Sequence, residues 1–118
     1  MNCINFYNAE RLVEKFSECT RLTHLDLSHN QIKPEGVENI SKVLEKLTLL
    51  KHLDLSYNSI SEEAIRITRV LKKCTSMIYI DLRNNFIRPV VKRISIETMK
   101  RILEYRECEY LISSEYKI

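Results

Sequence analysis

The sequence predicts an α/β fold: a short solenoid, a right-handed β-α superhelix, with parallel strands on its concave face and helices on its convex face. Two observations predict it. One short segment recurs three times, starting at Leu22, Leu50 and Met77, and apolar helical stripes separate the copies. Periods of this length are typical of repeat proteins, whose stacked units share one core.

The recurring segment places apolar residues at fixed positions and ends near an asparagine. Its copies read LTHLDLSHNQI at 22–32, LKHLDLSYNSI at 50–60 and MIYIDLRNNFI at 77–87. All three fit L-x-x-L-x-L-x-x-N-x-L with aliphatic substitutions. Successive side chains of a strand point to opposite faces, so each copy predicts a short strand with its central apolar residues in the core.

The segments between the copies carry apolar residues at spacings of three, four and three, which form one stripe on a helix. The stripes are Val37, Ile40, Leu44, Leu47; Ala64, Ile67, Leu71, Cys74; and, before the first copy, Ala9, Leu12, Phe16, Cys19. Each unit is therefore expected to be a strand, a turn and a helix of about three turns. Because each helix returns the chain to the same edge, neighbouring strands are expected to pair in parallel.

The register extends towards the N-terminus. Asn2 precedes Asn30 by the same interval as Asn30 precedes Asn58, and Asn8 precedes Gly36 by that interval too. Glycine and asparagine tolerate a left-handed turn best, which predicts such a turn at Asn8 and Gly36. We expect the chain to start inside a repeat, with a helix over 9–19 as the amino-terminal cap of the solenoid.

Beyond the third copy the pattern decays. Pro89 is expected to stop regular structure, and the segment 95–107 is expected to form a helix with Ser95 as its N-cap. Apolar residues within 108–112 predict a degenerate fourth strand, and 113–118 is expected to be frayed. We expect one domain over 1–118: a half-repeat with capping helix at 1–21, repeats at 22–49, 50–76 and 77–94, and a C-terminal cap at 95–118.

The motif and its period resemble leucine-rich repeat proteins, and in particular the ribonuclease-inhibitor-like class, over residues 2 to about 87. That class also includes the repeat regions of Ran GTPase-activating proteins, tropomodulins and NOD-like receptors. The resemblance implies that ligands bind the concave strand face. It also implies a structural ladder in which asparagines bond the backbone of neighbouring turns: Asn2, Asn30, Asn58 and Asn85.

Composition excludes several classes of site. One glycine is too few for a phosphate-binding loop, a dinucleotide-binding turn or a nucleophile elbow. The cysteines contain no C-x-x-C pair, so neither a structural zinc site nor any other cofactor is expected. The first residues contain no basic n-region and no long apolar stretch, so we expect no secretory signal, and no apolar run is long enough to suggest a membrane span. We therefore expect reduced thiols and an intracellular, cytoplasmic location. The cysteines are Cys3, Cys19, Cys74 and Cys108.

All three histidines fall on the expected concave face. Its residues stack into columns, namely His24/His52/Tyr79, Asp26/Asp54/Asp81, Ser28/Ser56/Arg83 and His29/Tyr57/Asn84. Aromatic side chains are frequent anchors at interfaces, which favours a recognition surface. Aspartate is also the usual residue at this position of the repeat, so the aspartate column is expected even if it has no functional role. The candidate partner-binding residues are His24, Asp26, His29, His52, Asp54, Tyr57, Tyr79, Asp81 and Arg83.

A zinc site at His24, His52 and a neighbouring aspartate is geometrically conceivable, but nothing orients the second ring nitrogens. A flat sheet also offers no closed pocket for hydrolysis. We therefore expect no metal and no catalysis. The favoured function is a non-catalytic scaffold that binds a partner protein through a preorganised strand face, either as a monomer or within a larger complex.

The C-terminal third is basic. Residues 83–106 contain seven basic and two acidic side chains. An alternative function is therefore binding of RNA or an acidic surface through a patch of Arg88, Lys92, Arg93, Lys100 and Arg101. We favour the interpretation that these charges are the solvated outer face of the cap, because no aromatic residues interleave to stack on bases. The family resemblance also leaves open a regulator of a GTPase or another enzyme.

Overall fold

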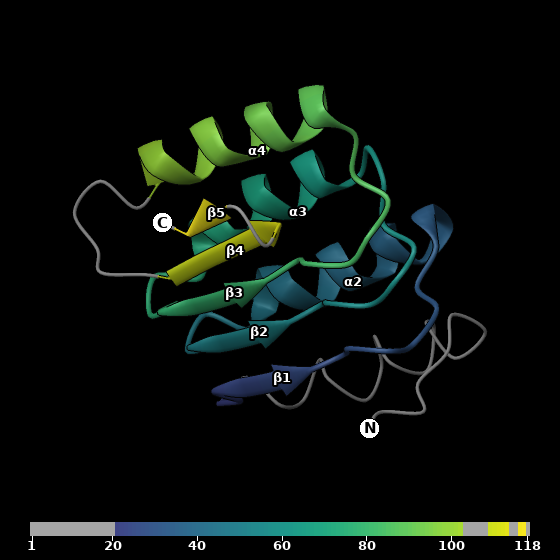
Figure 1. Cartoon of the computed structure of the whole chain (residues 1–118). Coiled ribbons are helices and arrows are strands. Elements are labelled where there is room, and N and C mark those ends of the chain that lie inside the picture. Colours follow the sequence, from purple (N-terminus) through teal and green to yellow (C-terminus); the bar gives the residue numbers. More distant parts are fainter. Residues whose placement is uncertain (1–20, 103–108, 114–115, 118) are drawn as a thin grey trace.

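The computed structural model describes residues 21–102, 109–113 and 116–117. Short strands alternate with helices along these segments (Figure 1). The strands are β1 (His24–Asp26), β2 (His52–Asp54), β3 (Tyr79–Asp81), β4 (Glu109–Ser113) and β5 (Tyr116–Lys117). The helices are α2 (Pro34–Lys46), α3 (Ala64–Val70), the 3₁₀ turn η2 (Leu71–Lys73) and α4 (Pro89–Ile102).

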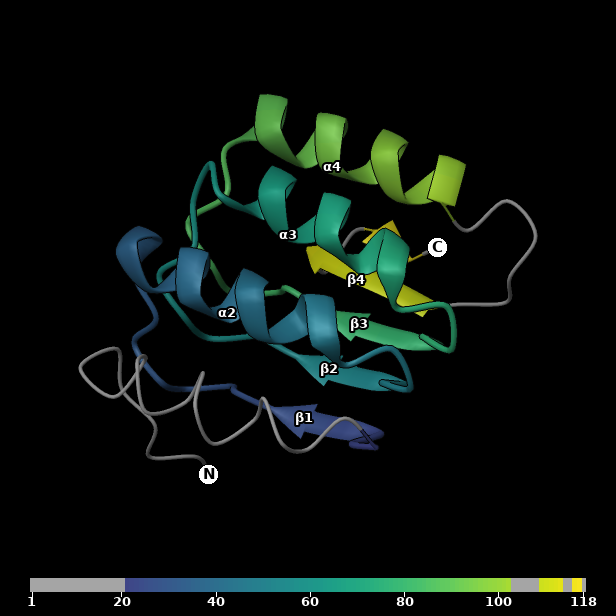
Figure 2. The ribbon, with the colours of Figure 1, turned by 180° about the vertical axis from the view of Figure 1, so that it is seen from behind.

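One sheet runs through the described segments in the order β1-β2-β3-β4-β5. The first four strands are parallel, and β5 pairs with β4 in the antiparallel sense. His24, His52 and Tyr79 are direct neighbours across β1, β2 and β3, which is the register of the sequence repeat. Helices α2, α3 and α4 all lie on one side of the sheet (Figure 2). The predicted α/β solenoid is therefore confirmed.

The core lies between the sheet and the helices. Leu25, Leu53, Ile80 and Tyr110 occupy the same register position in the four parallel strands, and all are buried. The predicted stripes of α2 and α3 pack onto this row. Each large apolar side chain buried in this way contributes about 1.5–3 kcal/mol, so the shared core is the main source of stability. The buried members of the two stripes are Val37, Ile40, Leu44, Leu47, Ala64, Ile67, Leu71 and Cys74.

Gly36 does not lie at a left-handed turn, so that prediction is wrong. It is buried inside the first turn of α2, and no glycine in the described segments has a positive φ. The reason is Pro34, which stands at the start of the helix and fixes its own φ at a helical value, so the residues after it are already helical. Asn8 lies outside the described residues.

Pro89 begins α4, which corrects the prediction that it ends regular structure. Its missing N–H would have no partner in the first turn of a helix, and its ring presets the helical φ. The Lys92 N–H already donates to the Arg88 carbonyl, 2.9 Å away. Ser95 is therefore not an N-cap: it lies inside α4 and is fully buried.

The C-terminal end is more regular than its sequence suggests. The predicted fourth strand is present as β4, and Ser113, Tyr116 and Lys117 are paired, although 113–118 was expected to be frayed. Two main-chain pairings hold β5 against β4, which explains the difference.

Some predictions lie outside the described residues. They concern Asn2, Cys3, the expected helix 9–19, Cys19, residues 103–107 and Cys108.

Cys74 is buried, and its Sγ lies 3.5 Å from the Leu44 carbonyl oxygen, to which it donates. This contact links η2 to α2, so the thiol packs as a small side chain between neighbouring units. Within the described segments, no helix combines the length and apolar character required to cross a membrane.

Candidate functional site

Asparagine carboxamides connect the turns that follow the strands. Asn58 Oδ1 accepts from the N–H groups of Asn30, at 3.0 Å, and Ile32, at 2.9 Å. Its Nδ2 donates to the carbonyls of Leu27, at 2.9 Å, and Leu55, at 3.0 Å. One buried side chain therefore satisfies backbone groups of two successive units, which fixes their spacing.

Asn85 repeats this arrangement one unit later. Its Oδ1 accepts from the Ile60 N–H at 3.0 Å, and its Nδ2 donates to the carbonyls of Leu55 and Leu82 at 3.0 and 2.9 Å. Asn30 Nδ2 donates to the Ser28 carbonyl at 3.0 Å. Asn58 and Asn85 hold the ends of neighbouring strands in register, whereas Asn30 braces its own turn, and these bonds position the side chains of the turns.

The residue before each asparagine has a left-handed backbone. The φ angles are 57° at His29, 56° at Tyr57 and 62° at Asn84, and Gln31 also has a φ of 56°. A left-handed conformation costs a residue other than glycine about 1–2 kcal/mol. Backbone bonds to the next unit hold it in place: the His29 N–H donates to Ser56 at 3.1 Å, and the Tyr57 N–H to Arg83 at 3.0 Å.

This turn displays an aromatic pair. The His29 and Tyr57 rings are stacked, with centroids 4.3 Å apart and an angle of 12° between their planes. Tyr57 is 53% exposed and His29 is also exposed. Two rings from successive units therefore stack face to face and are exposed to solvent together.

A second row of rings lies at the start of the strands. The His24 and His52 rings are stacked at 4.3 Å and 12°, and the Tyr79 ring follows at 5.7 Å from His52 with a tilt of 34°. Parallel pairing in register produces this row, because the three residues are direct neighbours in the sheet. Thr23 Oγ1 lies 2.9 Å from His24 Nδ1, which restrains the first ring.

Between the two rows lies the aspartate column, and its first two members brace the turns. Asp26 Oδ1 accepts from the Ser28 N–H at 2.9 Å and from its hydroxyl at 2.6 Å. Asp54 does the same with Ser56, at 2.9 and 2.6 Å. Ser28 and Ser56 are buried, which corrects their placement among the exposed residues of the face. The pattern of aspartate followed by serine is thus a turn-stabilising feature.

The third aspartate differs because arginine replaces the serine. Arg83 donates to Asp81 through its N–H at 3.0 Å, Nε at 3.1 Å and Nη2 at 2.9 Å. The Tyr79 hydroxyl donates to Asp81 Oδ2 at 3.2 Å. Asp81 is only 3% exposed, so its carboxylate is covered by its neighbours and is not open to solvent. Arg83 covers the carboxylate and presents its own guanidinium edge.

These contacts raise the pKa values of two ionisable groups, Tyr79 and Arg83. Burial, and then the Asp81 carboxylate, raises the pKa of Tyr79 above its ordinary value. The hydrogen bonds and charge of Asp81 raise the pKa of Arg83, which stays protonated. Tyr79, Asp81 and Arg83 therefore form one hydrogen-bonded group whose outer surface is phenol and guanidinium.

We call the surface formed by the nine candidate residues the strand face. It carries two rows of rings, a braced aspartate column between them and one arginine. In the described segments, no cluster of three or more histidine, cysteine, aspartate or glutamate side chains is arranged to hold a metal ion. The arrangement suits contact with a broad partner surface.

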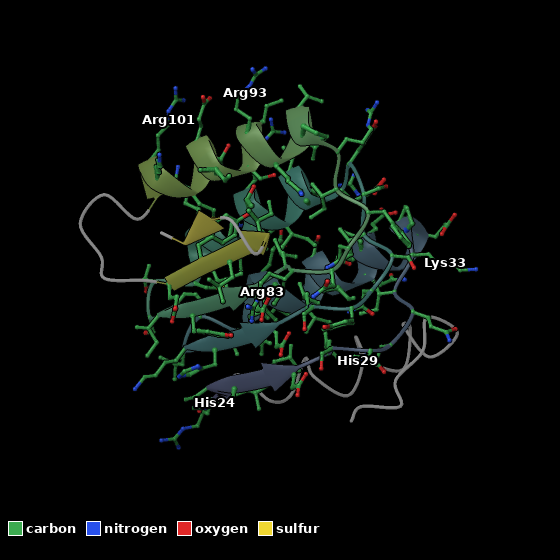
Figure 3. The ribbon with its side chains drawn as sticks, in the orientation of Figure 1. His24, His29, Lys33, Arg83, Arg93 and Arg101 are labelled. Atoms are coloured by element: carbon green, nitrogen blue, oxygen red, sulfur yellow. The ribbon has the colours of Figure 1, made fainter. Side chains whose placement is uncertain are left out.

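The basic residues lie elsewhere. Lys92, Arg93, Lys100 and Arg101 belong to α4, and Arg93 and Arg101 project away from the sheet (Figure 3). His24, His29 and Arg83 lie at the strands and their turns in the same view. Arg88 forms an ion pair with Glu62 and Lys92 is partly buried, so the five cations do not form one open patch.

Sequence reasoning missed two features. It did not anticipate the grouping of Arg83 with Asp81, although an arginine in place of serine after the aspartate was a visible signal. It also missed an open pocket of about 550 Å³ lined by Arg69, Lys72, Thr98 and Arg101. The signal for that pocket was weak, because it needs the packing of α3 against α4.

Comparison with known proteins agrees with this geometry. Residues 18–41 and 46–65 match a family model described as Leucine Rich repeat. A comparison with curated proteins found no match. The matched segments include β1 and β2, and β3 continues the same register in space. Domains with such repeats commonly mediate protein–protein interaction. Residues 18–41 and 46–65 are therefore similar to leucine-rich repeats, and the strands they contain belong to a short solenoid that β3 continues.

Proposed function

We propose that the chain is a non-catalytic interaction module that binds a partner protein through the strand face. The observation that carries this proposal is the pair of aromatic rows, in which five rings from three successive units are exposed or half-exposed, four of them stacked in two pairs and the fifth, Tyr79, tilted against His52. Rings of this kind supply large contact areas with few torsions to order.

The mechanism is preorganisation. The asparagine bonds, the braced aspartates and the left-handed turns fix the rings before a partner arrives, so little conformational entropy remains to be lost on binding. Arg83 adds a charged group at one side of the rows, which favours a partner with an acidic or carbonyl-rich patch at that position. As part of this proposal, we place the chain in the ribonuclease-inhibitor-like class of leucine-rich repeat proteins and in the cytoplasm.

The experiment compares two triple variants of the full chain. Partners are captured on immobilised chain and identified by mass spectrometry, and the recovered partner is then titrated against each variant. The strand-face variant is His52→Ala/Tyr57→Ala/Tyr79→Ala. The control is Glu38→Ala/Lys42→Ala/Lys46→Ala, three exposed residues of α2.

The proposal predicts that the strand-face variant weakens binding at least about 100-fold, because central aromatic anchors contribute about 2 kcal/mol or more each. The α2 control should bind within about twofold, since exposed charges away from an interface contribute little. Urea unfolding of both variants verifies the fold. Unchanged binding by a folded strand-face variant would refute the assignment.

Use of the basic residues of α4 is the weaker alternative. Two of the five cations are engaged or partly buried, and α4 contains no aromatic residue on which a base could stack. A dependence of partner binding on Arg93 and Lys100 would favour it.

A further inference from the structure

The pocket between α3 and α4 lies at the C-terminal ends of both helices. Arg69 belongs to the last turn of α3, Lys72 to η2, and Thr98 and Arg101 to the last turns of α4. The helices lie side by side on the side of the sheet away from the strand face (Figure 2). The pocket is therefore separate from the surface assigned above to a partner protein.

Its lining is strongly cationic. Among the residues that the structure describes, Arg69, Lys72 and Arg101 line a space of about 550 Å³ together with one hydroxyl, that of Thr98. Among the described residues, none of these three cations forms an ion pair, whereas the nearby Lys73 pairs with Glu45. Three like charges round one hollow repel one another, and an anion would relieve that repulsion.

Each cation also lies near the end of a helix, where it offsets the partial negative charge of the last carbonyls. That effect explains one basic residue on each helix. It does not explain why residues from three elements face the same pocket, nor why Glu97, in the turn before Arg101, forms no ion pair with it in the described structure.

We propose that this pocket binds a ligand with two or more adjacent phosphate groups. Guanidinium groups match phosphate oxygens with paired hydrogen bonds, and an ammonium adds a point charge, so Arg69, Arg101 and Lys72 together suit clustered phosphates. The volume falls within the usual range of small-ligand sites. The Thr98 hydroxyl, which donates to the Ile94 carbonyl at 2.9 Å, keeps lone pairs that can accept from a ligand hydroxyl.

The test titrates inorganic tripolyphosphate into the full chain by calorimetry. The pocket variant is Arg69→Gln/Arg101→Gln. The matched control is Lys42→Gln/Lys46→Gln, which removes the same charge from exposed positions of α2, including one in its last turn. Thermal unfolding of both variants shows that the fold is intact.

We expect saturable binding with one site, weakened about tenfold or more in the pocket variant and within about twofold in the control. Absence of saturable binding would overturn the proposal, as would equal losses in the two variants, because equal losses indicate a general charge effect.

Two further arms distinguish the source of the phosphates. Vesicles of phosphatidylcholine with phosphatidylinositol bisphosphate are sedimented with the chain, beside vesicles of phosphatidylcholine alone. Sedimentation that the pocket variant loses and tripolyphosphate reverses supports a lipid-borne phosphate. Saturable tripolyphosphate binding without sedimentation supports a soluble ligand. Binding of a single-stranded RNA by a chain that binds neither phosphate probe would overturn the proposal.

Discussion

The rings of His29 and Tyr57 stack at 4.3 Å, although the two residues belong to different repeats and both have a left-handed backbone. The repeat places them in the same turn of successive units, and the strained φ angle points both side chains out of the core. A conformation that is unfavourable for each residue alone thus creates a shared surface. In proteins such strain persists where the surrounding structure determines the conformation.

Asn58→Ala is expected to destabilise the chain by about 3–4 kcal/mol. The substitution leaves the N–H groups of Asn30 and Ile32 and the carbonyl of Leu27 without their side-chain partner, and buried groups without partners are costly. The Leu55 carbonyl loses one donor but keeps Asn85 Nδ2. Urea unfolding measures the loss. The control is Asn39→Ala, a partly exposed residue of α2 that should change stability by less than about 0.5 kcal/mol. Equal effects at both positions would contradict the role of Asn58.

Gln31→Gly is expected to stabilise the chain by about 0.5–1 kcal/mol. Gln31 is exposed and has a φ of 56°, a value that glycine adopts without the penalty of a Cβ atom. Gln31→Val should destabilise it by about 1 kcal/mol or more, since a β-branched residue tolerates a positive φ least. Thermal unfolding of the two variants gives the order. A valine variant as stable as the glycine variant would show that the turn relaxes.

Arg83→Ala and Arg83→Ser should differ. Alanine leaves the buried Asp81 carboxylate with fewer donors and should cost about 1–2 kcal/mol. Serine at position 83 should form the same pair with Asp81 that Ser28 forms with Asp26 and Ser56 with Asp54, where the hydroxyl donates at 2.6 Å. It should therefore recover most of the lost stability. Urea midpoints of the three proteins test this. If serine is no better than alanine, the third turn does not share the geometry of the other two.

Stability should fall as the pH rises above about 10. Burial raises the pKa of Tyr110 well above its ordinary value, and the neighbouring Ser95 hydroxyl lowers it by less. The pKa of Tyr79 is also raised. In the unfolded chain both phenols ionise near pH 10, so the unfolded state loses protons that the folded state keeps, and its free energy drops. Below that pH both states are protonated and these phenols contribute no pH dependence.

The variant Tyr110→Phe separates this effect from general alkaline denaturation. The Tyr110 hydroxyl is buried and makes no hydrogen bond of ordinary geometry in the described structure, so its removal at pH 7 should leave stability unchanged or slightly higher. Between pH 10 and 12 the variant should lose less stability than the parent. Circular dichroism during urea unfolding at each pH supplies the comparison, and identical alkaline losses would contradict the assignment.

The sequence alone predicts the repeat architecture well because its period determines strand register. The neighbours His24, His52 and Tyr79 follow directly from the alignment of the three copies. The period does not determine which of two possible local backbone conformations a residue adopts. Pro89 can end a helix or begin one, and in the structure it begins α4, which packs beside α3. Glycine is a residue type that favours a left-handed turn, but Gly36 is helical because Pro34 starts the helix before it.

Side-chain partners were harder to predict than backbone positions. Asp26, Asp54 and Asp81 occupy one column, yet only the third is covered by an arginine, because the residue two positions later differs. The basic residues illustrate the same limit. Their number was visible in the sequence, but the grouping of Arg69, Lys72 and Arg101 depends on how two helices lie together.

The two-residue strand β5 has a consequence for the association of molecules of this protein through the edge of the sheet. Lys117 and Tyr116 pair with Leu111 and Ser113, so part of the outer edge of β4 already has main-chain partners. An open edge of that kind is a template for strand addition from another molecule, which leads to uncontrolled polymerisation. The antiparallel direction of β5 also differs from that of every other strand in the sheet. A parallel strand from a second molecule would have to displace it before the stack could lengthen at this end.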